Sequence, residues 1–496
     1  MPKAYFLPFA WALLFWASFH PLALGPLAWA SLVPLLLYAK LTSGRKAFFV
    51  AWLGGALGYG ASMFWVRFTV PAGPYGMGVY CGLYVAVFVL LVRRLGPLWS
   101  PAIWVALEYV RSHLFGGFAW FLLGTTQQEA FNLIQILDLG GVWLVSALIA
   151  FVNGAIVDGR RLPRAIAGAA VLASVVYGLI RIPTIEMSEG PKITIVQPNI
   201  PQDLKIESLS DPKLAVENYQ KHMALMPQAA AEKPDVIFWP EAAIYRGVLW
   251  DAVKKEWVDT GWHRRILAAA EAAGTRVVLG SLVVDERGAV DYDFTNSALE
   301  VDPGKGVGRR FDKVHLVPFA EYAPFGLRKI INGISGLKME DMKPGTEFPV
   351  WDVAGFRYGP QICFEAVFPE ISREIARKGA AFTVNISNDG WFRDSAELDQ
   401  MQVMSRFRAI ENRIGFVRAT NTGISAFIAP TGREDAVLEV EGRRKEVGGT
   451  LTRRVSVTSS TSLYRGLGDW VAWAAVGAVI AAFGRRLIVD RRRRGA

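Results

Sequence analysis

The stretch Tyr358–Glu370 reads YGPQICFEAVFPE and places a cysteine at a bend between two predicted elements. The apolar, β-type run before Cys363 indicates a buried strand, and Pro369 suits the first turn of a helix. A thiol at such a strand end can be activated by a neighbouring base, while converging backbone N–H groups hold an oxyanion. A lone cysteine is more often buried and unreactive, so Cys363 needs partners before it indicates catalysis.

Outside this stretch the chain is unusually apolar, because 52% of its 496 residues are hydrophobic and 17 are tryptophan. The length exceeds one ordinary domain, and the composition is typical of a membrane protein. Most of eight apolar runs approach the roughly 20 residues that cross a bilayer core, so we predict eight membrane-spanning helices. The runs cover residues 4–20, 23–39, 47–68, 76–92, 98–116, 133–156, 165–182 and 468–484.

Basic residues gather at alternate ends of these runs. The clusters are Lys3, Lys40/Arg45/Lys46, Arg93/Arg94, Arg160/Arg161/Arg164 and the tail with Arg485, Arg486 and Arg491–Arg494. The positive-inside rule therefore predicts that both termini are cytoplasmic. It places the long segment between the seventh and eighth runs outside, in the periplasm of a Gram-negative cell or its equivalent.

That long segment differs from the rest of the chain in charge and in pattern. Residues 190–452 hold 33 Lys/Arg and 36 Asp/Glu, whereas the rest of the chain holds 21 Lys/Arg and 8 Asp/Glu. The basic excess therefore belongs to the apolar part. Because a nucleic-acid site would be expected on the other part, no nucleic-acid partner is expected. Strand-like runs alternate with helical patterns, which predicts a layered α/β domain. We therefore expect a membrane domain over 1–185, an α/β domain over 190–453, and a last span with a basic tail over 466–496.

Two further residues in this segment are candidates for catalysis beside Cys363. Glu241 follows the apolar strand in DVIFWPEAAI, where Trp239 would partly shield it and favour a role as general base. Lys313 lies in FDKVHLVPFAEYAPF and would stabilise a thiolate and an oxyanion, with Glu321 orienting it or sharing a proton. Each residue taken alone is more often an ordinary surface or turn residue. Two cysteines and five scattered histidines predict neither a disulfide framework nor a metal or other cofactor.

The order and spacing of these residues resemble a known superfamily. Glu241, Lys313 and Cys363 follow one another at intervals of 72 and 50 residues, within WPE, KVHLVPF and CFE. These motifs resemble the nitrilase superfamily, whose catalytic set is Glu-Lys-Cys in that order. Phe311 and Ala320 replace the more usual Tyr and Gly, and both changes are conservative.

Seven predicted spans before such a domain and one after it resemble the apolipoprotein N-acyltransferase family, over essentially the whole chain. Further matching stretches are VQPNIPQ at 196–202, NISNDGWF at 385–392 and RATNTGISAFIAPTG at 418–432. The resemblance implies an αββα sandwich outside an inner membrane, in a protein that we expect to be a monomer.

The same resemblance implies the chemistry. A Cys363 thioester would carry an acyl chain from a phospholipid to the α-amine of a diacylglyceryl-cysteine lipoprotein, completing lipoprotein maturation. Glu241 would act as base and acid and Lys313 would stabilise the oxyanion. Supporting roles are implied for Glu321, for Glu365 and for Phe364, whose backbone N–H would be a second oxyanion donor. We also predict contacts with substrate for Trp120, Trp239 and Trp391, although an interfacial anchor is the commoner role for a residue such as Trp120.

Several interpretations stay open at this stage. Residues 322–345 mix apolar, basic and glycine residues, and form either a mobile arm that dips into the membrane surface or a plain crossover loop. Glu108, Arg111 and Asp138 lie in apolar runs and either line a lipid route or form structural ion pairs, the role we favour for Arg111. The competing functions are a membrane-tethered amidase or nitrilase that hydrolyses a small amide, and a transporter or scaffold with a non-catalytic outer domain.

Overall fold

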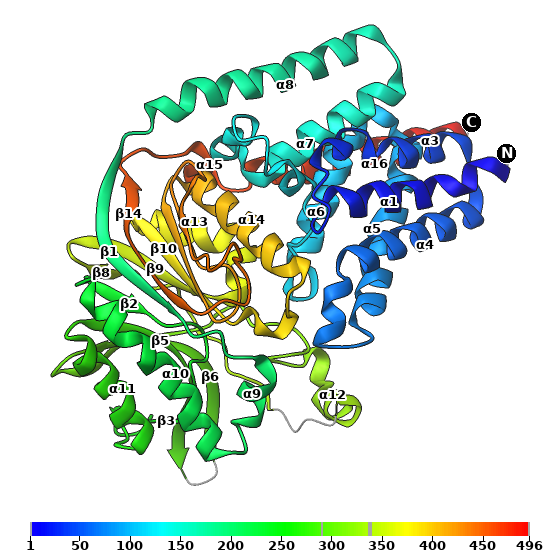
Figure 1. Ribbon diagram of the computed structural model, residues 1–496. Helices are drawn as coiled ribbons and strands as arrows, with labels where there is room; N and C mark the ends of the chain where they lie inside the picture. The colour runs from blue at the N-terminus through cyan, green and yellow to red at the C-terminus, as the bar shows by residue number, and fades with distance from the viewer. Residues whose placement is uncertain (1, 289–290, 336–339, 495–496) are drawn as a thin grey trace. The chain divides into compact units, whose positions relative to one another are not determined.

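The computed structural model describes residues 2–288, 291–335 and 340–494, and these divide into two compact units (Figure 1). Unit 1 comprises Met1–Ile185, Ser395–Glu411 and Thr461–Ala496, and unit 2 comprises Glu186–Asp394 and Asn412–Ser460. The chain therefore leaves unit 2 for one helical segment, returns to it, and re-enters unit 1 at the C-terminal end.

Unit 1 is helical. Its principal helices are α1 (Leu7–Ser18), α3 (Val33–Leu41), α4 (Gly44–Ser62), α5 (Gly73–Leu95), α6 (Ser100–His113), α7 (Leu137–Asp158), α8 (Arg161–Arg181), α14 (Ala396–Asn412) and α16 (Trp470–Arg494). Glycines with positive φ end two of them, Gly96 after α5 and Gly159 after α7, where a side chain would be strained.

Within the described residues, three helices are long and apolar enough to cross a membrane. They are Gly73–Leu95, Leu133–Asp158 and Arg161–Thr184, which coincide with the fourth, sixth and seventh predicted spans. Two shorter apolar helices, Ala4–Ser18 and Gly25–Leu41, lie at the first two predicted spans. The apolar helices fit a membrane protein, whereas the number of eight spans stays a prediction.

Three charged residues inside the apolar runs of unit 1 have specific polar partners. Arg111 donates to the carbonyl oxygens of Phe118 (3.0 Å) and Trp120 (2.6 Å), so it supports the loop that follows α6. Glu108 accepts from the backbone N–H of Leu123 at 2.6 Å. Asp138 accepts from Tyr177 and pairs with Arg181 at 2.9 Å, which ties α7 to α8.

Unit 2 contains two sheets in the part that the structure describes. The first has the order β14-β1-β2-β5-β3-β4, with β6 paired to β5 and β7 paired to β6. Its strands are β1 (Met187–Gln197), β2 (Val236–Phe238), β3 (Ile244–Asp251), β4 (Glu256–Trp257), β5 (Arg276–Gly288), β6 (Asp291–Asp302), β7 (Gly306–Asp312) and β14 (Gly449–Thr458). Strands β1, β2 and β5 run parallel, so their carboxyl ends meet at one edge.

The second sheet has the order β13-β12-β11-β10-β9-β8. Its strands are β8 (Trp351–Val353), β9 (Phe356–Ile362), β10 (Phe382–Ser387), β11 (Gly415–Thr420), β12 (Ala426–Ile428) and β13 (Glu434–Val437). Strands β9, β10 and β11 are parallel neighbours. Every residue of β10 and β11 is buried, as expected for central strands that are covered on both faces.

Helices cover both sheets, which contact one another through β1, β11 and β14. Helices α10 (Pro212–Ala231) and α11 (Gly261–Ala273) pack on the first sheet, and α13 (Pro369–Arg377) packs on the second (Figure 1). The caps of α10 and α11 are built into the sequence, because Asp211 and Thr260 accept from the first-turn N–H groups of Lys213 and His263. The result is the layered α/β architecture expected from the pattern.

The stretch considered as an arm, residues 322–345, is described in part. It contains a short 3₁₀ turn, Pro324–Gly326, and helix α12, Arg328–Ser335. Residues 336–339 lie outside the described residues. Asp341 accepts from the N–H of Ala323 and from Arg328 Nε, so it links the two ends of this stretch. The arm hypothesis stays a prediction.

Candidate active site

The three candidate residues all lie just beyond the ends of strands in unit 2. Glu241 comes two residues after Trp239, beyond the end of β2, Lys313 follows β7, and Cys363 follows β9. Asn388 comes directly after β10. Strand ends in layered α/β folds are where functional side chains gather, because the backbone turns away there and leaves room above the sheet.

Glu241 is 6% exposed and its carboxylate is held at both oxygens. Oε1 accepts from Asn296 Nδ2 at 2.7 Å, and Oε2 accepts from the backbone N–H of Asn388 at 2.9 Å. Gly280 on β5 packs directly beneath, because a Cβ there would lie 2.5 Å from Glu241 Cα. The position of this carboxylate is therefore fixed from three elements.

Lys313 lies between two carboxylates and is 1% exposed. Its Nζ is 2.8 Å from Glu321 Oε1 and 3.5 Å from Glu241 Oε1, and Asn296 Nδ2 also donates to Glu321 at 3.0 Å. Burial by itself would lower the pKa of Lys313, but Glu321 and Glu241 raise it above its ordinary value. The side chain is thus a permanent cation in a nearly dry site.

Cys363 adopts a left-handed backbone conformation, with φ of +51°, and is half-buried. Such a conformation is uncommon for a residue with a side chain, and its strain is typical of functional turns. Asn385 donates to the Cys363 carbonyl at 3.1 Å and holds the turn. Burial and the charge of Glu241 raise the pKa of the Cys363 thiol, although Lys313 opposes this. The resting sulfur is therefore protonated and needs a base.

Glu365 forms the underside of the same turn and is fully buried. Its carboxylate accepts three backbone N–H groups, from Ile362 (2.7 Å), Val314 (2.7 Å) and His315 (3.0 Å). It therefore joins the segment after Lys313 to the turn that carries Cys363. Burial raises the pKa of Glu365 to about 7, even though these N–H groups favour the ionised form.

Asn388 is supported by a buried ion pair. Its neighbour Asp389 pairs with Arg418 at 2.6 Å, and both side chains are fully buried. Asp389 also accepts from Ser387. The Asn388 side chain donates to Gln202 at 2.8 Å, so the N–H that faces Glu241 is held on both sides. The NISNDGWF stretch supplies Ser387, Asn388 and Asp389 to this arrangement, whereas Arg418 and Gln202 come from elsewhere in unit 2.

The predicted aromatic residues have different surroundings. Trp239 is fully buried in the core of unit 2, where its ring stacks on His222 and its Nε1 contacts Met226 Sδ at 3.2 Å. Trp391 is half-buried in the turn that follows Asn388. The ring of Phe364 packs edge-on against Phe368. Trp239 thus packs beneath the site, whereas Trp391 is partly open to solvent.

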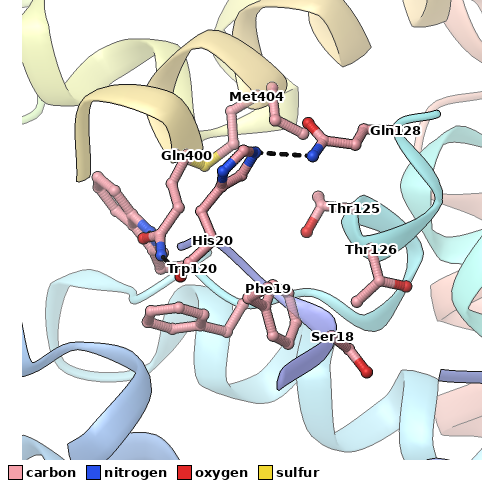
Figure 2. A pocket seen from close by; sticks show the side chains of 11 residues that line it. Ser18, Phe19, His20, Trp120, Thr125, Thr126, Gln128, Gln400 and Met404 are labelled. Atoms are coloured by element: carbon pink, nitrogen blue, oxygen red, sulfur yellow. Dashed lines mark hydrogen bonds between the residues drawn. The ribbon is translucent and has the colours of Figure 1, made fainter. Parts of the chain in front are cut away.

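Trp120 lies in unit 1 and lines a small cavity there (Figure 2). Its Nε1 donates to Gln400 on α14 at 2.7 Å, and Trp65 donates to the same oxygen at 3.2 Å. Across the cavity His20 contacts Gln128 at 2.7 Å (Figure 2). Substrate contact by the predicted tryptophans stays a prediction.

The sequence reasoning missed three residues that contact the candidate site. Asn296 bridges Glu241 and Glu321, the Asn388 N–H binds Glu241, and Lys205 contacts the Glu241 carbonyl. Asn296 lies within a strand-like run of the sequence, and Asn388 lies directly after another. A polar residue at such a position was the sequence feature that could have indicated a contact with the site. Lys205 carried no signal, because its helix has an ordinary polar composition.

Comparisons with known proteins agree with this architecture. Residues 11–155 match the family "Apolipoprotein N-acyltransferase N-terminal domain", and residues 192–439 match "Carbon-nitrogen hydrolase". An apolipoprotein N-acyltransferase of Geobacter metallireducens is 33% identical, over 91% of this chain and 89% of its own length. A relative of the same name from Aquifex aeolicus is 28% identical, over 78% of this chain and 87% of its own.

Solved structures of nitrilase-superfamily proteins resemble part of the chain. Saccharomyces cerevisiae Nit3 is 17% identical, with a TM-score of 0.40 over 57% of this chain and 94% of its own. The Caenorhabditis elegans NitFhit protein is 20% identical, with a TM-score of 0.41 over 57% of this chain and 64% of its own.

The α/β part of the chain is a nitrilase-like, carbon–nitrogen hydrolase domain, as its family match and layered sheets agree. This domain is joined in one chain to apolar helices. The chain belongs to the apolipoprotein N-acyltransferase family.

Proposed function

We propose that this protein transfers an acyl chain from a phospholipid to the α-amine of a diacylglyceryl-cysteine lipoprotein, through a thioester on Cys363. The names of its relatives support an acyltransferase that acts on lipoproteins. The observation that carries the proposal is the buried group of Glu241, Lys313 and Glu321, because the charges of Glu241 and Lys313 act on the Cys363 thiol at its strained turn. A protonated thiol, a carboxylate and a fixed cation are what nucleophilic acyl transfer requires.

In the first half-reaction Glu241 takes the proton of the Cys363 thiol as the sulfur attacks the ester carbonyl carbon. The negative charge that develops on the carbonyl oxygen is stabilised by Lys313 and by the backbone N–H of Phe364. The carbon–oxygen bond then breaks, and the proton held by Glu241 passes to the departing alkoxide. The products are an acyl thioester and a lysophospholipid.

In the second half-reaction the lipoprotein α-amine attacks the thioester carbon, and Glu241 takes a proton from the amine nitrogen. The carbon–sulfur bond breaks and the thiolate recovers that proton, which restores the resting enzyme. The fixed contacts of Glu241 with Asn296 and Asn388 support this role, because a base that serves both half-reactions must keep one position.

The membrane part of the proposal follows from the substrates. Exposing an acyl chain to water costs about 0.8 kcal/mol per CH₂, so the reaction must occur where the chains stay in lipid. We propose eight spans within 1–185 and 466–496, a catalytic domain over 190–453 on the periplasmic side of the inner membrane, and cytoplasmic termini. The distribution of basic residues supports this orientation.

The test uses the full chain in detergent or nanodiscs with a phospholipid that carries a labelled acyl chain. We expect a labelled thioester on Cys363 and transfer of the label to a diacylglyceryl-cysteine peptide. Cys363→Ala abolishes both, whereas Cys81→Ala, a change in the buried cysteine of unit 1, is the matched control and leaves both intact. A thioester that is released only by water would favour an amidase-like hydrolase, and absence of any thioester would refute the proposal.

A further inference from the structure

A second buried lysine contacts Glu241, through its backbone carbonyl oxygen rather than through its carboxylate. Lys205 lies in α9 (Gln202–Glu207) and is 1% exposed. Its Nζ donates to the Glu241 carbonyl oxygen at 3.4 Å and lies 5.2 Å from the centre of the Tyr245 ring. Lys205 takes no part in either proposed half-reaction.

Burying an ammonium group is costly unless partners compensate, so the position of Lys205 calls for a reason. Burial lowers the pKa of Lys205 to about 7, and the charge of Glu241 opposes this. Below that pH the Lys205 side chain is therefore a cation, and the negative charge of Glu241 favours this charged form.

The titratable groups around Lys205 come from two other segments. His222 on α10 is neutral, because burial lowers its pKa to about 3 and Lys205 adds to the effect. Tyr245 is neutral too, because burial raises its pKa above the ordinary value. Glu241 is consequently the one of these three neighbours whose charge complements Lys205.

The backbone at this point also needs support. Ala242 has φ of +47°, a strained value for a residue with a side chain, so the turn that presents Glu241 is held by its surroundings. The Lys205 hydrogen bond acts on the carbonyl immediately before that residue. The same side chain can therefore fix the turn and supply positive charge to it.

We propose that Lys205 is a positioning residue for Glu241: it fixes the carbonyl of Glu241 and its positive charge stabilises the Glu241 carboxylate as the base. This inference rests on the proposed role of Glu241. Loss of the charge removes a nearby cation from a site that must carry negative charge when Cys363 reacts, so the reactive form of Cys363 should appear at higher pH.

The experiment follows alkylation of Cys363 by iodoacetamide between pH 5 and 9 in the full chain, with the labelled peptide identified by mass spectrometry. This readout needs no lipid, so it remains informative if the phospholipid donor is wrong. We expect Lys205→Met to move the acidic midpoint of the alkylation profile upward by about one pH unit, by the interaction of one unit charge. Lys205→Arg keeps the charge and should retain the wild-type midpoint.

Lys213→Met is the matched control, because Lys213 is exposed on α10, and its profile should superimpose on that of the wild type. The melting temperature of Lys205→Met shows whether this variant folds. If it does not fold, Lys205→Gln is the second test, because glutamine keeps an N–H donor and removes the charge. A wild-type midpoint in a folded Lys205→Met or Lys205→Gln variant overturns the inference. If no thioester forms from phospholipid, that result counts against the proposed acyl donor. It does not change what the alkylation profile says about Lys205.

Discussion

At the scale of single residues, the turn at Cys363 combines strain with a protonated nucleophile. Its φ of +51° is maintained by Asn385, which donates to the Cys363 carbonyl, and by Glu365, which accepts from the N–H groups of Ile362 and of the segment after Lys313. Because burial raises the pKa of the thiol, reactivity depends on proton transfer to a base rather than on a stable thiolate.

Glu365 should make stability fall as pH rises. Its pKa of about 7 exceeds the ordinary value of 4.5, so the folded state holds the proton more tightly than the unfolded state. The contribution is complete below about pH 4.5 and is lost as pH rises to about 7, which amounts to about 3 kcal/mol. In Glu365→Gln this dependence is absent, so the stability advantage of the wild type over the variant should shrink from pH 4.5 to 7.

The measurement for Glu365 is the melting temperature of both proteins across that pH range. Glu347→Gln, an exposed carboxylate on a loop of unit 2, is the control and should keep the wild-type pH dependence. A difference between wild type and Glu365→Gln that is constant with pH would contradict the prediction.

At the scale of elements, the strand ends bring distant residues together. The predicted strands before Glu241 and Cys363 are present as β2 and β9, and NISNDGWF begins in β10, so pattern reasoning located the supports of the site. The pattern could not locate the contact at Gly280, where β5 lies so close to the turn after β2 that no side chain fits.

Gly280→Ala should impair catalysis by displacing Glu241. A Cβ at this position would lie 2.5 Å from Glu241 Cα and 2.6 Å from Ala242 N, contacts that backbone atoms cannot accommodate without moving. A displacement of about 1 Å costs about 10²-fold in rate. Gly288→Ala, at the exposed end of the same strand with open space around it, is the control and should be fully active in the acyl-transfer assay. Equal rates for the two variants would show that the strand contact does not position Glu241.

Helix α14 should be anchored within unit 1 by Glu411. Its carboxylate accepts from the Val142 N–H at 2.9 Å, where α7 is interrupted at Gly140 and Gly141, and it also binds Arg408 at 2.8 Å. Glu411→Ala removes the acidic partner of a buried ion pair and should cost about 3–5 kcal/mol of stability. Glu374→Ala, which breaks an exposed pair with Lys378 on α13, should cost under about 1 kcal/mol. Chemical or thermal unfolding measures both, and equal losses would refute the anchoring role.

At the scale of the whole molecule, the chain joins a carbon–nitrogen hydrolase domain to apolar helices, and its relatives extend over both parts. The segment Ser395–Glu411 belongs to the helical unit although it follows β10 in sequence. The chain crosses between its two units at this point as well as at the two ends of the α/β part.

The proposed orientation predicts where cysteine labels react. In a chain with Cys81→Ala and Cys363→Ala, Asp203→Cys should react with a membrane-impermeant maleimide in intact spheroplasts. Arg161→Cys should react only after permeabilisation, because the turn between α7 and α8 is expected in the cytoplasm. Asp203 and Arg161 are both exposed, so a difference in labelling between the two cysteines would not reflect a difference in burial. The reverse pattern would refute the orientation.

Three features were predictable from the amino-acid sequence alone: the apolar character of the N-terminal part, the alternating elements of the α/β domain, and the family. The relatives confirm the family. These depend on local hydrophobic patterns and on side-chain types at strand ends, which are visible in one dimension. The contacts of Asn296, the Asn388 N–H and Lys205 with Glu241, and the burial of Trp239 in the core, appear only in the folded chain. A backbone N–H is the same group at nearly every residue, and burial is set by neighbours distant in sequence, so only tertiary packing decides them.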